Sequence, residues 1–342
     1  MDDKRYGVGV AGISWVSGEH IKAFEKNPHT RVVALQSASL DNAMASRERF
    51  GLREAQVYTD YEKMLADPRV DVVTICSTNE KHARQGILGA QAGKHLLIEK
   101  PVALSLEDLR ALQQAINRAG VRSIVSFVLH WNPYFQSIRA FIEGGAMGRP
   151  FYGEVDYFSG NWEHWYPGLH WVRTRAQGGS AYLAAGCHAV DGLRFFMPGE
   201  VKEVFALSGN FTGLMEWDAT ICSLLRYEDG RIGKVACVLE GNNKYWFNVR
   251  LHGKDGTVIN EKFRTHLLPG TTAWAQFETV MPDSPDVTHH PFQGEIDALV
   301  DGIVLGVPIN PDIDDAVKTH EIIFAAEQSA RERRPVSLPL PA

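Results

Sequence analysis

The chain has 342 residues, of which 44% are hydrophobic and 22% are charged, and its formal net charge is -6. This is the composition of a globular protein, and the length is sufficient for two domains. The negative charge argues against nucleic acid or an anionic membrane as a partner, and no apolar run is long enough to span a bilayer. We therefore expect a protein that binds small molecules.

The N-terminus and the cysteines indicate the compartment. Residues 1–5 have no apolar signal core behind a basic start. Cys76, Cys187, Cys222 and Cys237 are scattered, without a Cys-x-x-Cys pair. The sequence thus predicts buried free thiols and a cytoplasmic location.

The first predicted strand, residues 6–11, runs into a turn that contains Gly12, Ser14 and Trp15. A helix is expected to follow, starting near Gly18. In the dinucleotide fingerprint Gly-x-Gly-x-x-Gly, this chain keeps only the first glycine, with Ser14 and Ser17 at the other two places. Small serines leave room for phosphate, and a helix N-terminus supplies N–H donors. Taken alone, the turn is compatible with dinucleotide binding or with a plain βα turn. The residues that would contact the cofactor here are Gly12, Ser14 and Trp15.

A second strand, residues 31–35, ends close to the position where folds that prefer NAD carry a ribose-binding acid. Ser37 lies near that place, and no carboxylate occurs before Asp41. A ribose 2′-phosphate would meet no repulsion there. The predicted cofactor is therefore NAD(P), with Ser37 as a contact and without a choice between NAD and NADP.

Strand and helix patterns alternate up to residue 125, which predicts a doubly wound parallel sheet. The apolar run 94–98 ends in Glu99, Lys100 and Pro101. Because proline cannot extend the strand ladder, Lys100 should lie at the carboxyl end of the strand, where ligands bind in open α/β sheets.

After residue 128 the pattern changes to strand-like segments with hairpin turns at 228–230 and 254–256. This predicts an α+β domain with a largely antiparallel open sheet, over residues 126–342, after a dinucleotide-binding domain at 1–125. Helices are expected at 292–305 and 313–331, and the proline-rich tail 335–342 is expected to lack regular structure.

Two motifs carry a family resemblance. Glu99-Lys100-Pro101 resembles the signature of the Gfo/Idh/MocA oxidoreductases, a family that includes glucose-fructose oxidoreductase and inositol dehydrogenase. Residues 178–191 resemble the second motif of that family, in which a glycine pair precedes Asp-x-Gly-x-His-x-x-Asp. The matching residues are Gly178, Gly179, Gly186, His188 and Asp191, whereas Ala184 replaces the first Asp.

The resemblance implies a Rossmann domain, a secondary alcohol or ketone of a sugar or cyclitol as substrate, and Lys100 and His188 as catalytic residues. An imidazole suits the role of base because it titrates near neutral pH, and the Lys100 ammonium can bond the same hydroxyl. The resemblance also places the loop with Ser77, Asn79 and His82 beside the nicotinamide ribose. His82 could instead be a helix-start residue bonded to nearby backbone. The cofactor contacts expected in this region are Ser77, Asn79, His82, Glu99 and Lys100.

The segment 160–171 is crowded with aromatic residues and would suit a pyranose or cyclitol, although a lid or subunit contact fits equally well. The expected substrate-binding residues are Lys100, His130, Trp162, His164, Trp165, Tyr182 and His188. The histidines show no tight ligand spacing, so no catalytic metal is predicted. By resemblance alone, a homodimer or homotetramer is expected.

Ala184 keeps two other functions open. One is an eliminative glycoside-cleaving enzyme, in which bound NAD transiently oxidises a sugar carbon. The other is a regulator that binds dinucleotide without catalysis. Retained Lys100 and His188 argue against the regulator.

Overall fold

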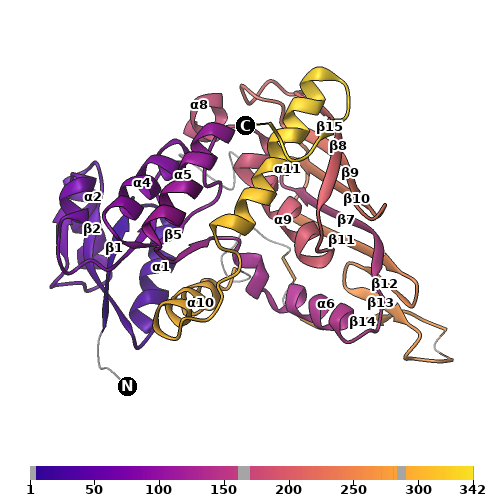
Figure 1. The fold of residues 1–342 in the computed structure, drawn as a ribbon, viewed down its shortest axis with the longest axis horizontal. Helices are drawn as coiled ribbons and strands as arrows, with labels where there is room; N and C mark the ends of the chain where they lie inside the picture. The colour runs from indigo at the N-terminus through magenta and orange to yellow at the C-terminus, as the bar shows by residue number, and fades with distance from the viewer. Residues whose placement is uncertain (1–4, 161–169, 271, 280, 283–289, 342) are drawn as a thin grey trace. The chain divides into compact units, whose positions relative to one another are not determined.

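The computed structural model describes residues 5–160, 170–270, 272–279, 281–282 and 290–341. The chain forms two compact units (Figure 1). The first contains residues 1–126 and 292–317, and the second contains residues 127–291 and 318–342. The chain first passes from the first unit to the second after residue 126, next to the predicted domain boundary after residue 125. The segment 292–317, which sequence patterns assigned to the second domain, clusters with the first unit instead.

The first unit contains a parallel sheet that, among the described residues, has six strands in the order β3-β2-β1-β4-β5-β6. Its strands are β1 (Tyr6–Ala11), β2 (Thr30–Gln36), β3 (Gln56–Tyr58), β4 (Val72–Ile75), β5 (His95–Ile98) and β6 (Ser123–Val125). The predicted doubly wound sheet is thus confirmed. The strand order reverses between β1 and β4, which is where such sheets bind ligands.

Helices cover both faces of this sheet. They are α1 (Trp15–Lys26), α2 (Leu40–Arg49), α3 (Tyr61–Leu65), α4 (Asn79–Gln91), α5 (Leu106–Ala119) and α10 (Phe292–Val304). Helices α4 and α5 pack together, and α10 packs beside α1 (Figure 1). Helix α5 begins with a side-chain cap, in which the Ser105 Oγ accepts the Asp108 N–H at 3.1 Å. Its left-handed Gly120 ends it.

The second unit is built on a mixed sheet, mostly antiparallel, with nine strands within the described ranges in the order β14-β13-β12-β11-β7-β10-β9-β8-β15. Its strands are β7 (Pro150–Phe158), β8 (Val201–Gly209), β9 (Thr220–Tyr227), β10 (Ile232–Val238), β11 (Trp246–Gly253), β12 (Gly256–Ile259), β13 (Lys262–Thr265), β14 (Ala275–Gln276) and β15 (Val336–Ser337). The central pair β7 and β10 is parallel. The tail prediction was wrong at one point, because β15 pairs with β8.

The helical segments of the second unit are η1 (Val128–Trp131), α6 (Pro133–Glu143), η2 (His170–Arg173), α8 (Arg175–Gly178), η3 (Tyr182–Gly186) and α9 (Cys187–Phe196). Helix α11 (Ile313–Glu332) begins in the first unit and continues into the second. Helix α9 packs on one face of β7 and β10. Gly153 and Gly233 face it, and an added Cβ at either would clash with Leu193.

Within the described residues, the other face of this sheet is open to solvent. Lys234 pairs in register with Glu154, and its Nζ lies 3.0 Å from the Glu154 carboxylate and 2.8 Å from that of Asp156. Large apolar side chains surround this charged group on the same face, namely Leu207, Leu224, Ile232 and Trp246. Such a surface is typical of a protein interface.

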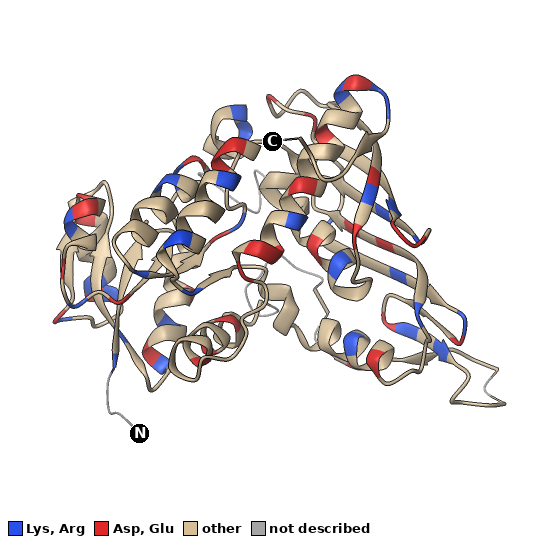
Figure 2. Ribbon diagram, in the orientation of Figure 1, with Lys and Arg blue, Asp and Glu red and all other residues tan. Residues whose placement is uncertain are grey.

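Charge is spread over both units. In the view of Figure 2, blue and red residues are interspersed along the outer helices and the strands rather than gathered into one basic stripe. Among the helices in the described ranges, none is long and apolar enough to cross a membrane.

Candidate active site

The turn after β1 lies at the strand-order reversal of the first unit. Gly12 has φ of +88°, and a Cβ there would lie 2.5 Å from both the Cα and the N of Ser77, which follows β4. The backbone therefore needs glycine both for its conformation and for its close approach to the neighbouring loop. This is the geometry that a phosphate-binding turn requires.

Helix α1 starts three residues later with a reciprocal cap. The Ser14 Oγ accepts the Ser17 N–H at 3.4 Å, and the Ser17 Oγ accepts the Ser14 N–H at 3.0 Å. The two serines that replace fingerprint glycines thus define the helix start, which begins at Trp15 rather than near Gly18 as the sequence suggested. The Trp15 side chain is 52% exposed beside them.

The other predicted cofactor residues of this unit follow strand ends. Ser37 comes after β2, and its Oγ accepts the Ser39 N–H at 3.2 Å. The Ser77 Oγ donates to Gln85 at 2.6 Å, and Asn79 is the first residue of α4. The structure thus brings Ser77 and Gly12 together at one edge, with Ser37 at the end of the strand adjacent to β1.

His82 connects the loop after β4 with the loop after β5. Its Nδ1 lies 2.7 Å from the Pro101 carbonyl oxygen, and its Nε2 lies 2.9 Å from the Ser77 carbonyl oxygen. The side chain is buried. Both ring nitrogens of His82 thus contact backbone carbonyls, and the Nδ1 contact holds the peptide between Pro101 and Val102, one residue beyond Lys100.

Glu99 and Lys100 follow β5. The Glu99 Oε2 accepts the backbone N–H of Lys100 at 3.2 Å, and its Oε1 lies 3.0 Å from the Nε2 of the buried His20. Burial raises the pKa of Glu99, but His20 and Lys100 lower it more, so it lies below its usual value. The carboxylate thus faces the interior of the unit, and Lys100 stands at the predicted strand end.

In the second unit, His188 lies in the first turn of α9, directly after a π-helical turn at Tyr182–Gly186. Such turns insert an extra residue and often occur at functional sites. His188 is buried, and its ring contacts Phe127 edge-on and His290, with centroid separations of 6.2 and 6.3 Å. His290 was not among the substrate-binding residues expected from the sequence.

Ala184 lies within the π-helical turn, at the position that corresponds by resemblance to the first Asp of the family motif. Tyr182, one of the expected substrate-binding residues, has its hydroxyl 2.9 Å from the Ser223 Oγ and 2.8 Å from the Val235 carbonyl oxygen. That hydroxyl is therefore engaged with the sheet.

His130 and Asp191 form a buried pair, with His130 Nε2 lying 2.7 Å from Asp191 Oδ2. Thr319 donates to the other Asp191 oxygen at 3.3 Å. These contacts hold η1 and α11 on α9 and define the position of the helix that carries His188. Trp162, His164 and Trp165 lie outside the described residues.

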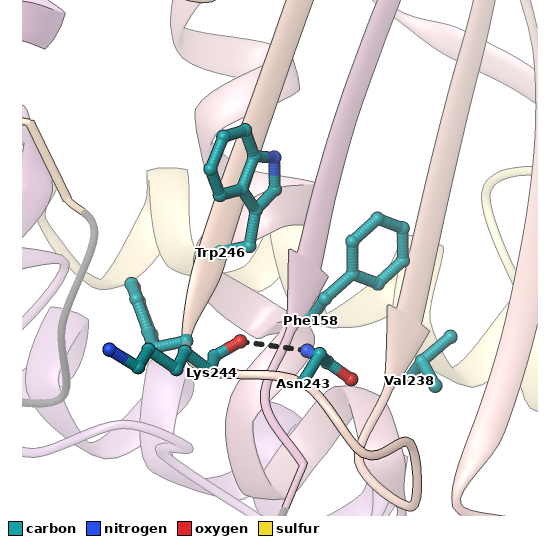
Figure 3. Close-up of a pocket in the computed structure, with 6 residues that line it drawn as sticks. Phe158, Val238, Asn243, Lys244 and Trp246 are labelled. Atoms are coloured by element: carbon teal, nitrogen blue, oxygen red, sulfur yellow. Dashed lines mark hydrogen bonds between the residues drawn. The ribbon is translucent and has the colours of Figure 1, made fainter.

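A surface pocket of about 310 Å³ in the second unit is lined by Phe158, Val238, Asn243, Lys244, Tyr245 and Trp246 (Figure 3). Cys237 faces Gly186 on the α9 side of the sheet, so the neighbouring Val238 faces the opposite side. The pocket is therefore separate from His188. Within the described ranges, no three His, Cys, Asp or Glu side chains form a metal-binding group.

Comparisons with known proteins agree with both units. Residues 6–127 match a protein family described as "Oxidoreductase family, NAD-binding Rossmann fold", and residues 135–259 match the C-terminal domain of the same family. D-apiose dehydrogenase of Paraburkholderia graminis is 28% identical over 98% of this chain and 90% of its own. Myo-inositol 2-dehydrogenase of Thermotoga maritima is 24% identical over 75% of each chain.

A solved structure of levoglucosan dehydrogenase with NADH and levoglucosan has the same fold, with a TM-score of 0.88 at 20% identity, over 98% of this chain and all of that one. The turn at Gly12 is suited to close approach of a dinucleotide phosphate, and the cofactor class of this Rossmann unit is NAD(P). The chain belongs to the Gfo/Idh/MocA family of oxidoreductases.

Proposed function

We propose that the protein is an NAD(P)-dependent dehydrogenase or reductase that interconverts a secondary alcohol and a ketone of a sugar, a cyclitol or a sugar derivative. The observation that carries the proposal is Lys100, placed at the carboxyl end of β5 and held there through Glu99 and through the His82 bond to Pro101. The named dehydrogenases among its relatives, which act on apiose and on inositol, support the substrate class.

Oxidation of the alcohol removes a hydride and a proton from the substrate. Bound NAD(P) would supply the hydride acceptor. His188 takes the proton from the substrate hydroxyl oxygen, and Lys100 donates a hydrogen bond to that oxygen as negative charge develops on it. Gly12, Ser14, Trp15, Ser37, Ser77 and Asn79 serve the nucleotide. We assign His82 and Glu99 to the support of the Lys100 backbone, and His130 and Tyr182 to the support of the segment around His188.

The first experiment is a spectrophotometric screen of the purified protein against cyclitols, free monosaccharides and glycosides, each with NAD and with NADP. Reduction of one nucleotide by one substrate class would establish the activity and the cofactor preference. Release of an aglycone without net nucleotide reduction would instead identify the eliminative glycoside cleavage that the missing carboxylate at Ala184 leaves open.

The second experiment tests the two residues. Lys100→Met and His188→Asn should each lower kcat by about 10²–10⁴-fold, the range for loss of an acid–base group, while nucleotide affinity stays within a few fold. If both act on one hydroxyl, the double variant should lose much less than the product of the two effects. Near-normal turnover in Lys100→Met would refute the assignment.

The open sheet face supports a further part of the proposal, a homodimer or homotetramer. Leu207 and Leu224 on that face are 62% and 52% exposed. Covering such side chains in a second copy removes apolar area from water. Sedimentation at micromolar concentration should show an oligomer that Leu224→Lys weakens, and a wild-type monomer would contradict it.

A further inference from the structure

Three ionisable side chains meet in the interior of the first unit, behind Lys100. His20 comes from α1, Glu99 from the end of β5, and Glu295 from α10. The His20 Nε2 lies 3.0 Å from the Glu99 Oε1 and 3.7 Å from the Glu295 Oε1. His20 and Glu295 are completely buried. One imidazole thus stands between two carboxyl groups, closer to Glu99.

Glu99 transmits this arrangement to Lys100. One of its oxygens faces His20, and the other accepts the Lys100 N–H. The carboxylate is therefore fixed from both sides, and the peptide plane of Lys100 follows the position of Glu99. If His20 moved away from Glu99, this support would lose one of its two contacts.

Glu295 has the contacts of an uncharged acid. The Ser126 Oγ donates to its Oε1 at 3.1 Å, whereas its Oε2 has no hydrogen-bond partner within the described part of the chain. A buried ionised oxygen without a donor is strongly unfavourable. Burial raises the pKa of Glu295 to about 8, with Glu99 raising it and His20 lowering it.

Three further side chains act on the cluster, namely Thr74, Cys76 and Lys100. Thr74 on β4 lies 2.7 Å from the His20 Nδ1, and Cys76 just beyond that strand lies 3.6 Å from the same atom. Burial lowers the pKa of His20, but Cys76 and Glu99 raise it more, to well above its usual value. The positive charge of Lys100 lowers the pKa of Glu99. Near neutral pH the cluster therefore holds a cationic His20, an anionic Glu99 and a neutral Glu295.

We propose that Glu295 is a positioning residue for Lys100: by keeping its proton at neutral pH, it leaves His20 bonded to Glu99, and when it ionises it competes for His20 and loosens the Lys100 peptide. The importance of Lys100 rests on the proposed function. The contacts within the cluster do not depend on it.

The first test compares the wild type with Glu295→Gln, which keeps the shape of the protonated acid, and with Asp301→Asn, which removes an exposed charge from the same helix. Between about pH 5 and 8 the folded protein holds a proton that the unfolded chain has lost, so wild-type stability falls with rising pH. The unfolding constant of the wild type should rise by up to tenfold per pH unit relative to Glu295→Gln, then level off. Asp301→Asn should follow the wild type. Parallel curves for the wild type and Glu295→Gln would overturn the proposal.

The second test observes Lys100 directly and needs no substrate. In protein labelled with ¹⁵N-lysine, the Lys100 amide signal is the one that disappears in Lys100→Arg. In the wild type it should move with a midpoint near pH 8, and it should stay in place in Glu295→Gln. A wild-type signal without this step would overturn the proposal even if the glutamine variant fails to fold.

A third measurement separates the positioning role from a merely structural one. Once a substrate is known, the alkaline limb of kcat/KM should shift in Glu295→Gln and remain in Asp301→Asn. If the alkaline limb does not shift in Glu295→Gln while Lys100 remains essential for turnover, this inference alone is refuted. If Lys100 proves dispensable for turnover, the proposed function is refuted.

Discussion

His130 Nε2 lies 2.7 Å from Asp191 Oδ2, and both side chains are almost completely buried in the second unit. The pair ties η1 to α9 one turn after His188. A residue expected to bind substrate is thus bonded to the last Asp of the family motif.

Asp191→Ala should destabilise the protein by about 3 kcal/mol, because it leaves the buried His130 imidazole without this acceptor. Urea unfolding would measure the loss. Asp218→Ala, at an exposed position, should change stability by no more than about 0.5 kcal/mol. Equal effects in the two variants would show that the buried pair contributes nothing.

Gly12→Ala should lower both stability and nucleotide affinity. Its Cβ would lie 2.5 Å from backbone atoms of Ser77 at a φ of +88°, so strain and overlap add to about 2–4 kcal/mol. Gly51 provides a matched control in the same unit, since its φ is +67° and nothing lies within 4 Å of an added Cβ. Gly51→Ala should lower the free energy of unfolding by about 1 kcal/mol. Its nucleotide affinity, measured by calorimetry, should equal that of the wild type. Similar losses of affinity in both variants would show that the close approach to Ser77 is unimportant.

Asp67→Asn should abolish part of the acid sensitivity of the first unit. Hydrogen bonds from Arg69, at 2.6 Å, and from Tyr58, at 2.9 Å, hold the pKa of Asp67 well below its usual range. A lowered pKa means that this stabilisation is present above about pH 4 and is lost as pH falls further. Because Arg69 is partly exposed, we expect about 1 kcal/mol at pH 7. Urea midpoints of the two proteins should differ at pH 7 and converge below pH 4, and a constant difference would contradict the assignment.

Lys234→Met should destabilise the open sheet most strongly at neutral pH. It leaves Glu154 and Asp156 facing each other without their common cation, at a cost of about 3 kcal/mol. Burial raises the pKa of Asp156 despite Lys234, and removal of Lys234 would raise it further. The loss should therefore shrink as pH falls from 7 towards 5. An unfolding midpoint that is equally reduced at pH 5 would mean that packing, not charge, is responsible.

The sequence predicted the first sheet well because parallel strands buried on both faces appear as short apolar runs, such as residues 94–98. The hairpins β9–β10 and β11–β12 were also evident from their turns. The parallel pairing of β7 with β10 was not, because a local pattern identifies neighbours in sequence and not partners 80 residues away. Strand β15 was hidden by the prolines around it.

The buried cluster escaped prediction for a similar reason. Glu295 stands in a helical pattern where a glutamate is normally exposed, and His20 is one of several histidines. Only the packing of α10 beside α1 brings them to Glu99. By contrast, the position of Lys100 at the end of a strand could be predicted, because an apolar run and a proline mark it in the sequence itself.

The return of α10 to the first unit also affects how the protein is made. A ribosome delivers His20 and Glu99 early, but the partner that completes their surroundings arrives only after residue 291. Until then, the nascent first unit lacks the apolar cover of Ile296, Leu299 and Val300, which the finished protein buries. The early chain therefore has an exposed apolar face to protect during synthesis. An exchange of the second unit between relatives would have to replace an internal segment and leave α10 in place.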